Sequence, residues 1–501
     1  MEVDVAVVGA GTAALAAGVA AAQAGATRVV LFEKAPRAES GGNSRFSTAG
    51  FRFWHRGAGE IREFLRWMPD DELSRLEVAE YSPEQFLADL REISGPHLDE
   101  KLCGVMVEAS NEALHWLLDL GLEWEPRQPW RVPAGSNGDR DERLALLPAR
   151  PIKARGGAEG GLRHLEAWRQ IAARWGVEIR YQSEVVGLEG NRAEVSGLWV
   201  RDGNCSYHVS AKAVILCSGG YQASSTFRRR YLGPAAERMK VRGSRHDTGE
   251  VLQMALDLGA ARGGELHGAY ISPVAADGPS HEVGNLASRY SYAFGITVNA
   301  NGERFVDEGE LESAYTYGRM AWATLSQPRS LAYQLFDSEG IQFVDHAAYG
   351  SVEVTGFARL TDLARHIGCD PDVLDATIEA YNRAVADEVS FDPTRRDGRC
   401  AAGVVPPKSN WATRLDRPPF YAYAVTPGIG FAFGGLKVDE HGAVLSREGR
   451  SIERLYASGD LLGLFSGDTG AKGCGFLTGS GQTRNAVFSL LAGRDAVGRF
   501  A

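Results

Sequence analysis

The sequence predicts an α/β protein organised around a Rossmann-like dinucleotide-binding domain. Residues 4–8 form a short run of small branched residues, which is typical of a strand buried on both faces. The run leads directly into Gly9-Ala10-Gly11-Thr12-Ala13-Ala14, a G-x-G-x-x-A turn. A second apolar strand at 28–32 ends in Glu33, about where an acid accepts ribose hydroxyls in this fold. Strand, turn, helix, strand and acid follow in the order that a dinucleotide site requires.

Each small residue of this turn has a physical role. Gly9 permits the tight turn from strand to helix, and Gly11 lets the backbone approach a pyrophosphate. Ala14 is small enough for the helix to lie close to the strand. We expect the helix that starts at Thr12 and Ala13 to offer free N–H groups and a positive dipole end to the phosphates.

Composition limits the class of protein. The 501 residues suggest two or three domains, and 54 basic against 64 acidic residues give a net charge of −10. This balance argues against nucleic acid or an anionic membrane as the main partner. There is no long apolar span, and the first strand lies so close to Met1 that we expect no signal peptide. A cytoplasmic location is therefore predicted.

Six scattered cysteines lack any metal or iron–sulfur spacing. We expect no metal site, so redox chemistry would use an organic cofactor. The loop after Lys34 is centred on Gly41-Gly42-Asn43-Ser44, and such a segment suits a backbone that wraps closely around a bulky flat ligand. An NAD-only fold does not need it.

The GAGTAA turn, Glu33 with Lys34, and GGNSRFSTAG followed by Arg52 resemble the FAD-binding half of the fumarate reductase and succinate dehydrogenase flavoprotein superfamily. The likeness is greatest to its tricarballylate dehydrogenase-like branch. The resemblance implies FAD as cofactor. Because Ser44 stands where membrane-complex members have a histidine bonded to the flavin, it implies non-covalent FAD.

Further FAD contacts come from later segments. The helix expected at 162–175 leads to a strand at 178–181 and on to Val185. The resemblance assigns cofactor roles to Ser218 and Gly219 after the strand at 213–216, and to Gly459 and Asp460 in the second FAD signature. It also implies that the helix entry containing Gly479 and Gly481 directs its dipole at the flavin. The segment HDTGEVLQMALDLGA, 246–260, resembles a family helix start.

The remaining chain predicts one inserted domain. Residues 55–125 have helical periodicity, with an apolar stripe over 97–120, and 126–157 is expected to be a long irregular loop. From about Glu265 to Pro427 the apolar alternation fades. We therefore predict an FAD-binding domain at 1–265 and 427–501 and an inserted α+β capping domain at 266–426, with the active site between them. The cap contains GITVNANGERFVDEG, which resembles a signature of the superfamily.

The resemblance predicts an oxidoreductase that moves hydride between a CH–CH or C=C bond and flavin N5. No second G-x-G-x-x-G and no redox cysteine pair is present, so the partners expected are a small-molecule substrate and an unidentified electron donor or acceptor. Hydride transfer at one carbon requires proton transfer at its neighbour, and the resemblance assigns this step to a residue of the cap. Arg319, in the Y-G-R segment, is one candidate, and Tyr315 or Tyr317 is a chemically easier relay because an arginine pKa exceeds about 12. His267 aligns with a carboxylate-binding histidine of the family.

Arg52 and Lys472 are the candidates for substrate binding. Two family cations are missing, because Gly430-Phe431 and Phe476 occupy their positions. This predicts a substrate with fewer carboxylates, or a larger and more aromatic one, next to Phe431 and Phe433. Two alternatives remain open: a ketosteroid Δ1-dehydrogenase-like oxidation of a cyclic ketone by a tyrosine, and a flavin-binding protein without turnover. RNA modification is disfavoured by the net negative charge.

Overall fold

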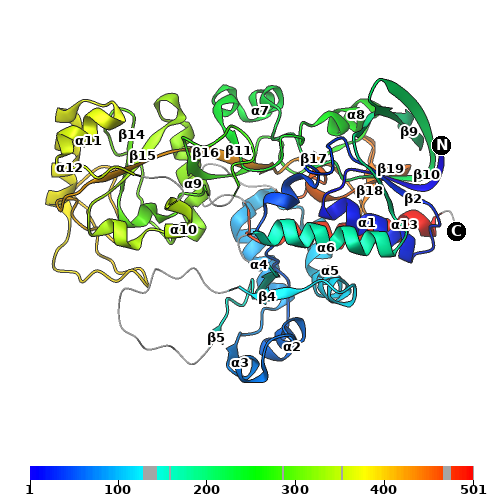
Figure 1. Ribbon diagram of the computed structural model, residues 1–501, viewed down its shortest axis with the longest axis horizontal. Coiled ribbons are helices and arrows are strands. Elements are labelled where there is room, and N and C mark those ends of the chain that lie inside the picture. The colour runs from blue at the N-terminus through cyan, green and yellow to red at the C-terminus, as the bar shows by residue number, and fades with distance from the viewer. Residues whose placement is uncertain (128–143, 157–158, 285–286, 351–353, 466–475, 500–501) are drawn as a thin grey trace.

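The computed structural model describes residues 1–127, 144–156, 159–284, 287–350, 354–465 and 476–499. Figure 1 shows the larger sheet with helices α1 (Thr12–Gln23), α6 (Gly160–Arg174) and α13 (Ser480–Gly498) at one end of the molecule. A smaller sheet with α11 (Leu360–Ile367) and α12 (Pro371–Ala384) lies at the other end. The short helices α2 (Ala58–Phe64) and α3 (Asp70–Ser74) project from one side.

Parallel strands at the centre of the larger sheet end in register. The strand order is β18-β19-β10-β1-β2-β7, with β8 and β9 attached through β10. In β1 (Glu2–Val8), Val8 lies opposite Phe32 of β2 (Val29–Phe32) and Leu216 of β10 (Cys205–Leu216). Leu216 in turn lies opposite Ala457 of β19 (Ser451–Ala457). Four loops therefore leave one edge of the sheet together, which is where ligands bind in open α/β folds.

The flanking strands complete this sheet. β7 (Glu178–Arg180) pairs in parallel with β2, and β18 (Ala443–Leu445) pairs antiparallel with β19. β8 (Ser183–Gly190) and β9 (Val195–Asp202) form an antiparallel extension.

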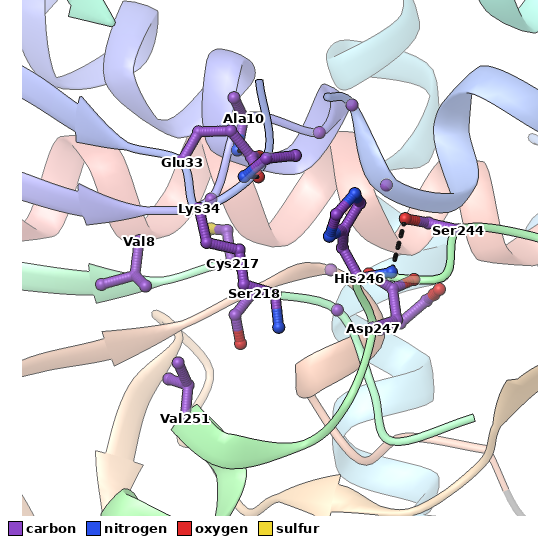
Figure 2. Close-up of a pocket in the computed structure, with 18 of the residues that line it drawn as sticks. Val8, Ala10, Glu33, Lys34, Cys217, Ser218, Ser244, His246, Asp247 and Val251 are labelled. Atoms are coloured by element: carbon purple, nitrogen blue, oxygen red, sulfur yellow. Dashed lines mark hydrogen bonds between the residues drawn. The ribbon is translucent and has the colours of Figure 1, made fainter. Parts of the chain in front are cut away.

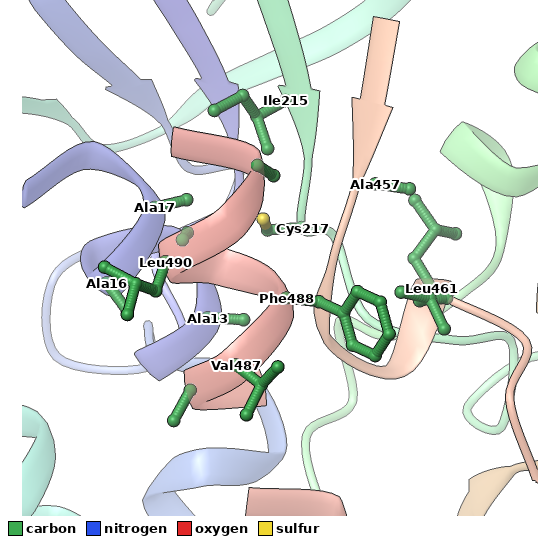
Figure 3. Packing of buried hydrophobic residues seen from close by; sticks show 14 of the residues in the cluster. Ala13, Ala16, Ala17, Ile215, Cys217, Ala457, Leu461, Val487, Phe488 and Leu490 are labelled. Atoms are coloured by element: carbon green, nitrogen blue, oxygen red, sulfur yellow. The ribbon is translucent and has the colours of Figure 1, made fainter. Parts of the chain in front are cut away.

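Helices α1 and α13 pack together against the sheet (Figure 3). Alanines dominate the buried positions of α1 because small side chains allow this close approach. At the contact, a Cβ on Gly493 would lie 2.6 Å from the carbonyl oxygen of Ala17. In Figure 3, Val487 and Leu490 lie beside Ala13 and Ala16. This packing fixes the start of α1, and with it the glycine turn.

The helical prediction for 55–125 largely agrees with the structure. This range contains α2 and α3 and also α4 (Pro83–Ser94) and α5 (Glu100–Asp119). A two-residue strand, β3 (Leu76–Glu77), interrupts the helices. The prediction of a single irregular loop over 126–157 is wrong for the part of this range that the structure describes. It contains β5 (Leu144–Ala145) and β6 (Ile152–Ala154), and β6 pairs antiparallel with β4 (Trp124–Pro126) because Trp124, Ile152 and Ala154 are buried there.

The smaller sheet has the order β11-β16-β15-β14, with β13 paired to β16. Its strands are β11 (Lys240–Val241), β13 (Ala269–Ala275), β14 (Ile296–Asn299), β15 (Ala332–Phe336) and β16 (Tyr421–Ala432). β11 and the end of β16 lie outside the 266–426 range expected for the cap, so those boundaries remain a prediction. Helix α9 (Ser313–Leu325) packs on β13 and β16.

The signature at 295–309 has a structural role in this sheet. Arg304 and Glu308 form a buried ion pair at 2.6 Å, and Glu308 also accepts a hydrogen bond from the Thr297 backbone N–H at 2.7 Å. Since each charge is satisfied by the other and by the backbone, the pair is stable without water. The four-residue spacing of Arg304 and Glu308 thus serves the folding of the loop after β14.

Candidate functional site

A cavity of about 860 Å³, open to solvent, lies at the shared edge of the parallel strands (Figure 2). It is bounded by the segments that follow β1, β2, β10 and β19. Fourteen of the predicted cofactor residues line it, namely Gly9, Gly11, Ala13, Glu33, Lys34, Gly41, Gly42, Asn43, Ser44, Val185, Ser218, Gly219, Gly459 and Asp460. Sequence segments more than 400 residues apart therefore meet where the dinucleotide site was expected.

The glycine turn leaves no room for a side chain. Gly9 has φ of 109°, and a Cβ there would lie 2.6 Å from the backbone oxygen of Cys217. Thr12 lies just behind the turn, where its backbone N–H and hydroxyl contact the Ser44 hydroxyl at 3.2 and 2.8 Å. The contact joins the two loops that flank the phosphate position, so the start of α1 is held facing the cavity.

Glu33 is buried at the end of β2 with its carboxylate fixed by the backbone. One oxygen accepts from the Ala10 N–H at 2.9 Å and the other from the Ala35 N–H at 2.8 Å. Burial raises the pKa of Glu33, and these two hydrogen bonds oppose the rise. Each oxygen keeps a second lone pair, which fits an acceptor for ribose hydroxyls. Next to it, the Lys34 ammonium donates to Thr248 at 2.5 Å and pairs with Glu250.

Asp460 and Asn43 form the opposite end of the cavity. Arg484, which is fully buried in α13, forms an ion pair with Asp460. The Asn43 amide donates to the Gly430 carbonyl at 2.6 Å and lies 3.5 Å from the other Asp460 oxygen. This network connects the loop at 41–44, here called the flavin loop, to strand β16, on which Phe431 lies.

Sequence reasoning missed Asp247. Helix α8 (Glu250–Leu258) begins inside the segment 246–260 that resembles a family helix start, and the turn before it lines the cavity with Ser244, His246 and Asp247. Asp247 is buried and accepts from Gln222 at 2.8 Å. A G-x-x-x-D-T-G-E turn has no periodicity of its own, so only its position before an apolar helix indicated the site. Six acidic residues line this cavity, among them Glu33, Asp247 and Asp460, and they suit a ligand rich in hydroxyl donors, as the ribose and ribityl groups of FAD are.

We predict that Asp247→Asn stabilises the protein without cofactor at alkaline pH. Burial and the nearby charges of Asp460 and Glu33 raise the pKa of Asp247 well above its usual range, while Lys34 opposes the rise. Stability is therefore lost as pH rises through this folded-state pKa, and the amide removes that loss. Thermal unfolding of the cofactor-free proteins from pH 5 to pH 9 should show that Asp247→Asn is more stable than the wild type by an amount that grows with pH, on the order of 1 kcal/mol. A gain that is equal at every pH would contradict this.

Beyond the Asp460–Arg484 pair lies a cluster of aromatic rings, here called the aromatic cluster, formed by Tyr270, Tyr290, Tyr317, Phe431 and Phe476. The Arg484 guanidinium lies 5.8 Å from the Phe431 ring, which connects the cluster to the cavity. Tyr270 stacks on Phe431 at 5.4 Å and meets Phe476 edge-on at 5.0 Å. Phe431 and Phe476 occupy the two positions where the resembled family has cationic residues, and their rings are in contact here. The cluster suits a flat apolar group.

The three cap candidates for proton transfer lie in different surroundings. Tyr317 is 4% exposed, contacts the rings of Tyr270 and Tyr290, and has its hydroxyl 3.1 Å from the Thr478 hydroxyl. Tyr315, on the same helix α9, is 59% exposed. Arg319 forms an ion pair with Glu310. Of the three, Tyr317 is the one that belongs to the aromatic cluster, judged by the contacts between described residues.

The remaining candidates are scattered. The Arg52 guanidinium donates to Tyr81 and Asp89, each at 2.9 Å, and to the Thr478 carbonyl at 3.2 Å, so its charge is already paired. His267 is exposed, and its Nδ1 contacts the Tyr231 carbonyl at 2.6 Å. Lys472 lies outside the described residues. Gly479 caps α13 against Phe51 and Arg52, and Gly481 lies beside Phe476.

The fold and the cavity define a dinucleotide-binding α/β protein whose glycine loops, acids and helix N-terminus fit FAD. A family model described as an FAD binding domain matches residues 4–475, so the chain belongs to this FAD-binding domain family. It binds FAD and is an FAD-dependent oxidoreductase that acts on CH–CH or C=C bonds. Within the described ranges, no helix is long and apolar enough to cross a membrane.

Curated relatives agree with this class. A probable fumarate reductase of Shewanella frigidimarina is 27% identical over 98% of this chain and 74% of that protein. A urocanate reductase of Eggerthella lenta is 26% identical over 99% of this chain and 74% of that protein. The solved open conformation of a flavocytochrome c3 fumarate reductase has a TM-score of 0.75 at 24% identity, covering 99% of this chain and 78% of that one, and shows the shared fold. The likeness to the tricarballylate dehydrogenase-like branch stays a prediction.

Proposed function

We propose that this enzyme reduces a conjugated C=C bond, or oxidises the matching CH–CH bond, in a substrate whose flat apolar part packs in the aromatic cluster. The observation that carries the proposal is the position of Tyr317. Its hydroxyl lies at the aromatic cluster, which is linked to the FAD cavity through Phe431 and Arg484. The names of relatives such as the fumarate and urocanate reductases support a carbon–carbon double bond as the reacting group.

FAD supplies the two-electron chemistry when it is bound, by accepting or giving hydride. The residues of the chain supply the rest. The aromatic cluster holds the substrate and excludes water from the reacting bond. The Tyr317 hydroxyl donates a proton to the substrate carbon next to the one that takes hydride, or removes it in the oxidative direction. The Thr478 hydroxyl, 3.1 Å away, takes the next place in a proton path toward solvent.

Arg319 fits this role less well. Its guanidinium is paired with Glu310, and the ion pair is partly exposed, whereas Tyr317 is buried. A phenol has a reference pKa near 10 and exchanges its proton more readily than a guanidinium. The cap boundaries at 266 and 426, non-covalent attachment of FAD and a cytoplasmic location belong to the same proposal.

The test is an anaerobic absorbance titration of the purified FAD-loaded protein. The chemically reduced enzyme is mixed with α,β-unsaturated carboxylic acids, and the oxidised enzyme with their saturated forms and with cyclic ketones. We expect the unsaturated acids to restore the oxidised flavin spectrum. Bleaching by cyclic ketones alone would favour the ketosteroid-type reaction instead. A flavin that chemical reductants reduce and no substrate reoxidises would contradict the proposal and favour a binding protein without turnover.

A further inference from the structure

Two arginines, Arg127 and Arg150, lie near the aromatic cluster, and the residues that the structure describes provide no acidic partner for either. They lie at one end of the hairpin formed by β4 and β6, where the Arg127 N–H donates to the Pro151 carbonyl at 2.8 Å and so brings Arg127 beside Arg150. The other two cations of this hairpin are paired across its strands: Lys153 with Glu125 at 2.8 Å, and Arg155 with Glu123 at 3.3 Å. In the described part of the chain, neither the Arg127 nor the Arg150 guanidinium has an ion pair with a carboxylate.

Backbone contacts place this hairpin on the segment that follows the flavin loop. The Ala154 N–H donates to the Ala49 carbonyl at 2.9 Å, and Gly50 forms a bridge with Lys153. Arg127 lies directly over Gly50, where its guanidinium fills the space that a side chain would need. The cationic side chain of Arg127 thus covers the backbone at Gly50.

The same guanidinium groups lie within electrostatic range of the proposed proton donor, Tyr317. Arg127 interacts electrostatically with the phenols of Tyr270 and Tyr317, and Arg150 with Tyr317 and Tyr315. Arg52 reaches the same region through its hydrogen bond to the Thr478 carbonyl, but its charge is neutralised by Asp89. Among the described residues, no carboxylate neutralises Arg127 or Arg150 beside the proposed proton donor.

Like-charge repulsion makes this arrangement unfavourable without an anion. Loss of water contact, together with the charges of Arg127 and Arg52, lowers the pKa of Arg150 to about 9. Both groups remain protonated at neutral pH, so two partly buried cations repel each other. A carboxylate between them would relieve the repulsion, and its planar pair of oxygens matches the guanidinium fork.

We propose that Arg127 and Arg150 bind the carboxylate of a monoanionic substrate whose aromatic or alkyl part lies in the aromatic cluster. The inference rests on the proposed function, because it assigns the substrate class of the same site. It also explains why Phe431 and Phe476 stand at positions where family members have cations: one carboxylate is held from the β4–β6 hairpin, and the other end of the substrate is apolar. A dicarboxylate would place its second charge against Phe431 and Phe476.

The test compares the binding of trans-cinnamate with that of trans-cinnamamide, which has the same ring and double bond but no charge. Isothermal titration calorimetry on the oxidised FAD-loaded protein gives both dissociation constants without turnover. We expect the acid to bind at least about tenfold more tightly than the amide, since charge-assisted bonds are lost with the neutral group. Arg127→Gln and Arg150→Gln should each remove most of that preference while leaving amide binding within about threefold.

Arg155→Gln is the matched control, because it removes a cation from the same hairpin that is exposed and already paired; it should keep the preference for the acid. Equal binding of acid and amide by the wild-type protein would overturn the inference. The inference would also be overturned if Arg127→Gln and Arg150→Gln lost FAD but kept the preference for the acid over the amide, because the arginines would then serve the cofactor. Tight arginine-dependent binding of cinnamate without reoxidation of the reduced enzyme would instead contradict the proposed reaction and leave the carboxylate site standing.

Discussion

Tyr317→Phe is expected to lower the rate of substrate-dependent flavin reoxidation by about 100- to 10,000-fold, the usual contribution of a positioned acid or base. The variant loses one oxygen, and the ring that contacts Tyr270 and Tyr290 stays in place. Binding of FAD and substrate should therefore change little, and the loss should appear in the rate of the chemical step. Anaerobic stopped-flow mixing of the reduced enzyme with substrate at saturating concentration measures that rate directly.

Two neighbours on α9 provide controls. Tyr315→Phe should retain near wild-type rates, because that side chain is 59% exposed and lies away from the aromatic contacts. Arg319→Gln removes a partly exposed ion pair with Glu310, and we expect an effect of less than about tenfold. A normal rate in Tyr317→Phe together with a lost rate in Arg319→Gln would transfer the proton role to the arginine.

The difference between these candidates shows what the sequence could not resolve. Y-x-Y-G-R places a tyrosine, a second tyrosine and an arginine within five residues, and all three are plausible by chemistry alone. Which of them points inward depends on the phase of α9 against β13 and β16, and that phase is set by tertiary packing. The Arg304–Glu308 pair illustrates the same limit, because its spacing resembles a functional signature while its contacts are those of a buried structural pair.

The FAD site was accessible from the sequence because its chemistry depends on the backbone. Gly9 and Glu33 follow their strands directly, Gly219 and Asp460 come shortly after the ends of theirs, and parallel strands bring such residues to one edge. The substrate site lacks this regularity. Arg127 and Arg150 lie in a stretch expected to be an irregular loop, and they meet only because the short strands β4 and β6 pair. Asp247 was missed for the same reason, since a turn without periodicity gives no signal.

Replacement of Gly9 by alanine should abolish FAD binding and destabilise the protein by roughly 3–5 kcal/mol, combining an unfavourable backbone conformation with overpacking. Gly25→Ala isolates the first of these costs. Both glycines have φ of 109°, but a Cβ on Gly9 would lie 2.6 Å from the Cys217 carbonyl oxygen, whereas a Cβ on Gly25 would meet nothing within 4 Å.

Gly25→Ala should therefore cost only about 1–2 kcal/mol and keep the bound flavin. Urea unfolding gives the two free energies, and absorbance of the purified protein gives the flavin content. Equal losses in the two variants would mean that backbone conformation alone explains Gly9. A larger loss at Gly9, accompanied by loss of FAD, would show that the close approach of the β1 turn to Cys217 shapes the phosphate site. The small size of residue 9 is then a requirement of the cavity wall as much as of the turn.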